Sequence, residues 1–350
     1  MQRSTCVRRV DCTGTDAHGV VDAFTENVAV VHGVLDDENR TRVNSALVTS
    51  LGPERVRCDE ALGPLTTFRT GGCADWFIDA RSAAELVEIL VATHGTGVPV
   101  TMLGGGSNVL IGDGGIRGLV ARARHGGIEL VRKGVVRAAT GVTLNGLVRW
   151  TINRGLGGLE AWAGTPGTVG GALFGNAHFR GRLIGDLVVA VGLAERDGAT
   201  RTVGVDDMEF AYDRSRLQRT NEVALWAEFL VRSADPGRLR ANARASLVYR
   251  KRTQPLDVPS AGCIFRNPDP NRDSVPEGIP LSAGALVDRA GLKGRAIGRA
   301  RVSDVHGNFI VSDGHARARD IRALIELCHG EVEQKFGVTL RREVVFLGEF

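Results

Sequence analysis

The chain has 350 residues, of which 43% are hydrophobic and 24% charged, and its formal net charge is +4 at pH 7. These values are typical of a globular protein with room for two or three domains, each with its own core. Its lysines and arginines are scattered and lack interleaved aromatic residues, which argues against a nucleic-acid partner and suits a small anionic ligand.

Nothing in the sequence indicates a membrane or an oxidising compartment. No apolar run approaches the ~18 residues of a membrane span, and the opening MQRSTCVRRVDCTG lacks the continuous apolar core of a signal peptide. The six cysteines form no C-x-x-C pair and no Cys/His metal spacing. We therefore expect a cytoplasmic protein with reduced thiols, no membrane partner and no metal site.

The first periodic segments predict a small α/β unit. Residues 36–51 predict a helix with its apolar positions on one face. A second helix is expected to begin after the N-cap Ser82, with Glu85 at the capping-box position, and to end at Gly95. Strand-like apolar runs flank this second helix, so residues 75–111 are expected to form a strand, a helix and a strand.

The later of these strands runs into Gly104, Gly105 and Gly106, followed by Ser107 and Asn108. Glycine lacks a Cβ and tolerates positive φ, so backbone N–H groups there can approach a phosphate closely. The dinucleotide fingerprint G-x-G-x-x-G fails because valine stands where its last glycine belongs, and no P-loop G-K-[ST] follows. On these residues alone, a phosphate pocket and a tight structural turn remain equal alternatives.

The rest of the chain predicts a second α+β unit and then a third with its own layout. Short strands with glycine turns follow residue 113, and a helix is expected over 144–155 before a second glycine-rich loop over 164–175. A linker at 234–237 precedes a basic helix over 238–254. The last third predicts a turn–strand–turn segment, a helix, two short strands, an amphipathic helix and a closing strand, over 259–268, 282–294, 300–314, 318–337 and 340–350.

Seven segments together carry a family resemblance, although none of them is decisive alone. In chain order they are TTFRTGG, LGGGSNVLIGDGGIRGLV, GLEAWAGTPGTVGGALFGNA, FAYDRSRL, PSAGCIFRNP, GLKGRAIGRARVSDVHGNFIV and LRREVVFLG, from about Thr66 to Gly348. This set resembles the shorter subclass of the UDP-N-acetylenolpyruvoylglucosamine reductase family. The resemblance implies an α+β fold, with a two-lobed FAD-binding domain of the para-cresol methylhydroxylase type and a C-terminal α/β substrate domain.

The resemblance also implies a division of the chain and a reaction. We expect an N-terminal extension over 1–38, FAD-binding lobes over 39–115 and 116–234, and a substrate-binding domain over 235–350. The implied reaction is the reduction of UDP-N-acetylglucosamine enolpyruvate to UDP-N-acetylmuramate in peptidoglycan precursor synthesis, with NADPH as co-substrate and non-covalent FAD. The implied partner is a small UDP-sugar, and we expect a monomer.

Two other functions remain open on these residues. One is a paralogue that binds flavin or a UDP-sugar without this turnover, and the other is a different flavin oxidoreductase on the same fold. Flavin absorbance and NADPH oxidation, measured with and without the UDP-sugar, would separate all three.

The resemblance assigns the FAD pyrophosphate to the two glycine-rich loops, which can enclose it from both sides with backbone N–H groups. Side chains of Asn108, Thr165 and Asn176 can add hydrogen bonds to phosphate, ribose or the flavin edge. The implied cofactor-binding residues are Gly104, Gly105, Gly106, Ser107, Asn108, Gly164, Thr165, Pro166, Gly167, Gly170, Gly171 and Asn176. Residues 104–112 contain neither histidine nor cysteine, in keeping with non-covalent FAD.

Two catalytic positions follow from the resemblance. Cys263 occupies the proton-donor position, where many members carry serine, and a thiol with an ordinary pKa of ~8.5 stays mostly protonated near pH 7. Glu343 is the carboxyl that the family uses beside the substrate. The structural alternatives are a buried, inert cysteine and a strand glutamate paired with Arg341 or Arg342.

The third implied catalytic residue, Arg214, departs from the family pattern. Asp213 stands in the usual arginine position, and an arginine one residue later would face the opposite side of a strand. A bulge or turn could restore its direction; otherwise Arg216 or a different basic residue takes over.

Three further residues are implied substrate contacts: Tyr212, Asn267 and Lys293. A solvated helix-end lysine is the alternative for Lys293. A second departure from the family pattern lies at residues 178–180, where His178 or Arg180 could contact an anionic group. His306 and Asn308 belong to a family block that a purely structural role would also explain.

Overall fold

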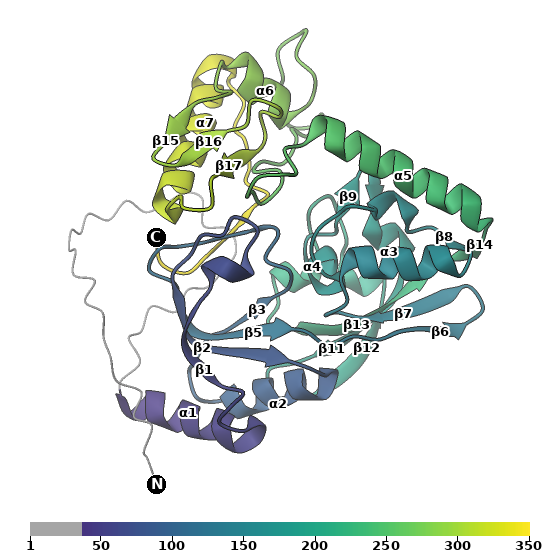
Figure 1. Cartoon of the computed structure of the whole chain (residues 1–350), viewed down its shortest axis with the longest axis vertical. Helices are drawn as coiled ribbons and strands as arrows, with labels where there is room; N and C mark the ends of the chain where they lie inside the picture. The colour runs from purple at the N-terminus through teal and green to yellow at the C-terminus, as the bar shows by residue number, and fades with distance from the viewer. Residues whose placement is uncertain (1–36) are drawn as a thin grey trace.

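The computed structural model describes residues 37–350 (Figure 1). The N-terminal extension expected over residues 1–38 lies outside the described residues, apart from the first two positions of α1 (Asp37–Leu51). This helix agrees with the predicted one. Val43 and Leu47 on its inner face are fully buried against α2 (Ala83–Thr93) and the first sheet.

The first sheet is mixed, with the strand order β1-β2-β5-β3. Its strands are β1 (Arg57–Ala61), β2 (Cys73–Ala80), β5 (Ile116–Ala123) and β3 (Val100–Leu103). β2 and β3 both pair with β5 in parallel, so the predicted strand–helix–strand unit is present with β5 between its two strands. The first sheet therefore extends to Ala123, beyond the expected start of the second lobe.

The cap of α2 follows the sequence pattern in part. Ser82 Oγ accepts the Glu85 N–H at 3.0 Å, which satisfies one of the free N–H groups at the helix start. The Glu85 carboxylate accepts the N–H of Arg81 instead of the N–H of Ser82, and it also pairs with Arg55. α1 and α2 lie together on one face of the first sheet (Figure 1).

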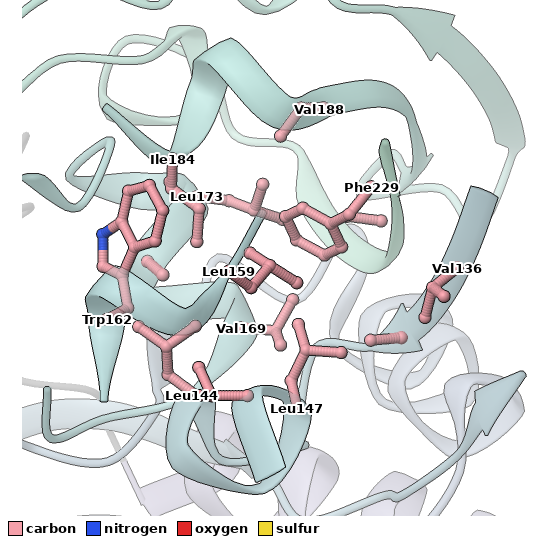
Figure 2. Close-up of a cluster of buried hydrophobic side chains, with 14 of the residues drawn as sticks. Val136, Leu144, Leu147, Leu159, Trp162, Val169, Leu173, Ile184, Val188 and Phe229 are labelled. Atoms are coloured by element: carbon pink, nitrogen blue, oxygen red, sulfur yellow. The ribbon is translucent and has the colours of Figure 1, made fainter. Parts of the chain in front are cut away.

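The second sheet is antiparallel, with the strand order β12-β11-β13-β7-β6. Its strands are β12 (Thr200–Gly204), β11 (Val188–Ala194), β13 (Val223–Leu230), β7 (Val135–Ala139) and β6 (Ile128–Arg132). Figure 2 shows part of the core of this lobe, which contains Leu144 and Leu147 of α3 (Leu144–Asn153) together with Val169, Trp162 and Phe229. All five side chains are buried, so this lobe has its own hydrophobic core.

The second glycine-rich loop is shorter than the sequence suggested. From Val169 it turns into a short helix, α4 (Val169–Phe174), whose N-cap Thr168 accepts the Gly171 N–H at 3.4 Å.

The basic helix α5 (Pro236–Thr253) packs on α3 and on the 3-10 turn at residues 160–162. This helix therefore lies along the second lobe, although the expected division assigns it to the substrate domain.

The C-terminal part has a separate core. A three-stranded antiparallel sheet packs with α6 (Ala283–Arg289) and α7 (Ala318–Phe336). Its strands are β15 (Ala296–Ile297), β16 (Ala300–Val302) and β17 (Ile310–Ser312). Leu286, Val302 and Ile321 are fully buried in this core.

Short pairings complete the fold. They are β8 (Leu156–Gly157) with β14 (Arg232–Ser233), β9 (His178–Phe179) with β10 (Arg182–Leu183), and β18 (Val345–Leu347) with β4 (Val109–Ile111). The last pair is parallel and returns the C-terminal end of the chain to the first lobe. No helix in the described part of the chain is long and apolar enough to cross a membrane.

Candidate active site

A large cleft of about 3510 Å³ is lined by residues from all three parts of the fold. Both glycine-rich loops line it, together with the turn at 211–214, the segment 259–268 and the approach to β18 at 339–346. The segment 259–268 forms no regular strand. It makes single bridges from Cys263 to Phe309 and from Phe265 to Arg342 instead of the strand expected there.

The two glycine-rich loops touch at positions that tolerate no side chain. A Cβ on Gly105 would lie 2.7 Å from Gly167 Cα, and a Cβ on Gly104 would lie 2.7 Å from Thr168 Oγ1. Gly106 has φ 61°, which favours glycine, and a Cβ there would meet the Leu65 carbonyl. The glycines therefore allow two backbone segments to meet along one wall of the cleft.

This wall fits the implied cofactor. A flavin dinucleotide needs close backbone approach at its pyrophosphate, and bare glycine backbone at the meeting point of two loops provides it. Eleven of the twelve implied cofactor-binding residues line the cleft. They are Gly104, Gly105, Gly106, Ser107, Asn108, Gly164, Thr165, Pro166, Gly167, Gly170 and Gly171.

Asn176 is the exception among the twelve. Its side chain is fully buried and does not line the cleft. Its Nδ2 donates to the Ala211 carbonyl at 2.8 Å, and its Oδ1 accepts the Gly185 N–H at 2.8 Å. The amide thus holds together two backbone segments behind the cleft.

Cys263 lines the cleft on a segment that Asn308 holds in place. The Ile264 N–H donates to the Asn308 carbonyl at 2.9 Å, and the Asn308 side chain bonds both the N–H and the C=O of Phe265. Burial raises the pKa of the Cys263 thiol well above its ordinary value, and the charge of Glu343 raises it further. The thiol is therefore protonated at neutral pH, and Asn308 has a structural role beside it.

Glu343 reaches the same cleft through backbone pairing with the cysteine segment. Its N–H donates to the Ile264 carbonyl at 2.8 Å, and its own carbonyl accepts from Asn108 Nδ2 at 3.2 Å. Burial raises the pKa of its carboxyl well above the ordinary range, Asp213 raises it further, and Arg266 opposes the shift. The carboxyl and the thiol thus stand beside the first glycine-rich loop.

The turn Ala211 to Arg214 separates its two charged residues. Ala211 and Arg214 exchange backbone hydrogen bonds of 3.0 and 3.1 Å, and Asp213 adopts φ 52°. Asp213 is only 4% exposed and its Oδ2 lies 2.6 Å from Arg266 Nε, whereas Arg214 is exposed at the cleft. Burial raises the pKa of Asp213 to about 7, against the opposing charge of Arg266.

Tyr212 of this turn shares the cleft with His178 and Arg180. Tyr212 lines the cleft, and burial raises the pKa of its phenol to about 12. The His178 ring lies 4.6 Å from the Tyr212 ring, and Arg180 lies over Tyr249 at 5.0 Å. All three residues of the second departure from the family pattern, 178–180, line the cleft.

The remaining implied substrate contacts differ in position. Asn267 lines the cleft, but its Oδ1 accepts the Ala283 N–H at 3.1 Å and so contacts the start of α6. Lys293 does not line the cleft; its Nζ pairs with Asp288 at 2.8 Å. The structure therefore does not bring Lys293 to the cleft; it lies in the turn after α6.

Two arginines in the cleft were not singled out from the sequence. Arg266 pairs with Asp213, and Arg250 of α5 is 6% exposed with its Nη2 2.6 Å from Thr165 Oγ1. The Arg250 guanidinium lies 3.9 Å over the Phe179 ring, and burial lowers its pKa to about 10. No sequence signal distinguished Arg250 from its exposed basic neighbours, because only packing against the second loop buries it.

Among residues 37–350 no group of His, Cys, Asp and Glu could hold a metal ion. The two-lobed fold with its paired glycine-rich loops is that of an FAD-binding protein. In keeping with this class, residues 74–204 match the family model described as FAD binding domain. Residues 254–347 match the model described as UDP-N-acetylenolpyruvoylglucosamine reductase, C-terminal domain.

The chain belongs to the UDP-N-acetylenolpyruvoylglucosamine reductase family. It is 38% identical to the enzyme of that name from Synechococcus sp. (strain JA-3-3Ab), over 85% of this chain and 92% of the relative. It is 34% identical to the one from Geobacillus kaustophilus, over 89% and 99%. The crystal structure of UDP-N-acetylenolpyruvylglucosamine reductase from Thermus caldophilus aligns with a TM-score of 0.68 at 31% identity, over 83% of this chain and 99% of that one.

These relatives confirm the resemblance, the α+β fold with its FAD-binding domain, and the oxidoreductase class. The alignments cover nearly the full length of the compared proteins, so the likeness includes the C-terminal part of the chain as well as the FAD-binding domain.

Proposed function

We propose that this protein reduces UDP-N-acetylglucosamine enolpyruvate to UDP-N-acetylmuramate in peptidoglycan precursor synthesis, with NADPH as reductant and non-covalently held FAD. The observation that carries the proposal is the meeting of Cys263 and Glu343 at one cleft beside the first glycine-rich loop. A site that only bound flavin or a UDP-sugar would not need a protonated thiol and a carboxyl beside the flavin loops.

The two glycine-rich loops would hold the dinucleotide through backbone N–H groups, with Ser107, Asn108 and Thr165 at their edges. When bound, FAD would accept hydride from NADPH and pass it to the enol ether. The chain's own residues then have three tasks: to bind the anionic substrate, to stabilise charge that develops beside its carboxylate, and to deliver a proton.

Cys263 is the proposed proton donor. Its raised pKa keeps the proton on Sγ at neutral pH, so the donor is already protonated before the substrate arrives. The guanidinium of Arg250 lowers the thiol's pKa and would stabilise the thiolate left after transfer. Solvent would then return the proton to Sγ.

Glu343 is the proposed partner at the developing charge. Its raised pKa favours the protonated carboxyl, which can donate a hydrogen bond to an anionic oxygen. Arg214, Tyr212 and Asn267 line the same cleft and remain predicted contacts for the substrate.

One experiment separates this function from its alternatives. The purified protein should show a flavin spectrum that is released on denaturation, and NADPH oxidation should be stimulated by UDP-N-acetylglucosamine enolpyruvate. Flavin reduction without this stimulation would favour an oxidoreductase with another substrate. Bound flavin that NADPH cannot reduce would favour a binding paralogue.

A further inference from the structure

The buried carboxylate of Asp213 is unusual in a cleft that must bind an anionic substrate. A carboxylate that is 4% exposed needs a cation or a proton, and the cation here is Arg266 at 2.6 Å. The two residues come from different parts of the fold, since Asp213 lies in the second lobe and Arg266 follows the cysteine segment. Their contact therefore exists only in the folded chain.

The geometry of this pair leaves part of the guanidinium free. Asp213 occupies the Nε side of Arg266, and among residues 37–350 the Arg266 side chain makes no other hydrogen bond or ion pair; its backbone N–H donates to the Arg341 carbonyl at 2.8 Å. An arginine has five N–H donors, so the two terminal nitrogens remain for a ligand in the cleft that Arg266 lines. Two parallel N–H groups fit a planar carboxylate in a bidentate contact.

Arg266 also stands close to the reacting groups. It lies three residues after Cys263 in the chain, and its charge acts on the carboxyl of Glu343. Arg214, by contrast, is exposed at the end of a turn whose buried member is Asp213. The positive φ of Asp213 directs these two neighbouring side chains to different surroundings.

We propose that Arg266 binds the substrate carboxylate in this chain and that Asp213 is a positioning residue that orients its guanidinium. The inference rests on the proposed reductase function. It assigns to Arg266 the cationic role that the sequence pattern suggested for Arg214.

The test compares three single variants of the flavin-loaded protein. R266Q is expected to lower kcat/KM for UDP-N-acetylglucosamine enolpyruvate by ~100-fold, because a desolvated charge-assisted contact is lost. R266K should recover part of this loss, since it keeps the charge but not the bidentate geometry. R272Q removes the same charge from an exposed arginine of the same cleft and should leave kcat/KM unchanged.

Two further readouts separate binding from a structural defect. NADPH should reduce the bound flavin of R266Q at the wild-type rate, and the thermal midpoint should stay within a few degrees of wild type. Titration with the substrate, followed by the flavin absorbance change, should give a weaker Kd for R266Q than for R214Q. D213N should produce an intermediate loss in kcat/KM, because it retains Arg266 but removes the carboxylate that orients the guanidinium.

The outcomes are distinguishable. If the wild-type protein shows no substrate-stimulated NADPH oxidation, the proposed function fails and this inference fails with it. If the wild type is active while R214Q loses more kcat/KM and substrate affinity than R266Q, the function stands and Arg266 is not the carboxylate-binding residue. Equal losses in R266Q and R272Q would also overturn the inference.

Discussion

At the scale of single residues, the environment of each group decides its chemistry more than its identity does. Cys263 and Cys328 are both thiols whose pKa burial raises, to about 12 for Cys328, but only Cys263 lines the cleft. The same holds for carboxyl groups. Desolvation raises the pKa values of Asp213 and Glu343, whereas the pKa of Glu228 is lowered because Arg137 and Arg132 outweigh its burial. A residue type therefore acquires its role from what surrounds it.

The first prediction concerns Cys263. Replacement by alanine removes the proposed proton donor and should lower substrate-stimulated turnover by ~100-fold or more. Replacement by serine keeps a donor of similar size and should retain substantial activity. Product formation measured alongside NADPH-driven flavin reduction checks this, because only the former should fall in C263A. Wild-type turnover in C263A would rule out the role.

The second prediction concerns pH. The pKa of Asp213 is raised from an ordinary ~3.9 to about 7, so the folded protein binds more protons than the unfolded chain between these values. The contribution of this group to the free energy of unfolding is therefore fully present below pH ~4 and is lost as pH rises through about 7.

The measurement is thermal unfolding from pH 5 to pH 8. D213N has no carboxyl to titrate, so its midpoint should fall less steeply with pH than that of the wild type. Parallel profiles for both proteins would contradict the raised pKa. D235N, a change at the exposed N-cap of α5, serves as a control for the loss of one carboxylate.

At the scale of elements, close contact between the two glycine-rich loops builds the wall of the cleft where we propose that FAD binds. The G105A variant should place a Cβ where the Gly167 backbone lies 2.7 Å away, and backbone cannot move aside as a flexible side chain can. We expect it to destabilise the fold by ~1–3 kcal/mol and to weaken FAD retention.

Gly126 supplies the matched control, because a Cβ there would meet nothing within 4 Å. G126A should keep wild-type flavin content and unfolding midpoint. Flavin content per chain, measured by absorbance after gel filtration, checks both variants. Full flavin loading of G105A would mean that the loops can separate without cost.

At the scale of the whole molecule, the site is assembled where three parts of the chain meet. The parallel pairing of β18 with β4 joins the C-terminal strand to the flavin lobe, and the Val345 N–H donates to the Asn108 carbonyl at 3.0 Å. The neighbouring bond from Asn108 Nδ2 to Glu343 then sets how far the carboxyl stands from the first glycine-rich loop.

The prediction at this scale is that V345P uncouples the two parts. Proline has no N–H for Asn108, and a displacement of Glu343 by about 1 Å is enough to lower turnover by ~100-fold. V345A keeps the N–H and should retain most activity. Circular dichroism and turnover of both variants check this, and equal turnover in V345P and V345A would show that the pairing does not position the carboxyl.

Much of this protein could be predicted from the sequence because its signals are local. Helices such as α1, α2 and α7 could be predicted from apolar periodicity and end signals. The two loops could be predicted from their runs of glycine, which let two backbone segments approach closely. The ordered motifs were enough to indicate the family, since each is a short stretch of chain.

The tertiary structure alone decided which polar groups meet. Asn176 and Lys293 both match family motifs. The Asn176 side chain, however, bonds a backbone carbonyl and a backbone N–H, and Lys293 pairs with Asp288. The pairing of Asp213 with Arg266 and the burial of Arg250 against Thr165 join residues far apart in the chain. Spacing in a sequence carries no information on such contacts, because desolvation and charge pairing depend on distances that exist only after the lobes have packed.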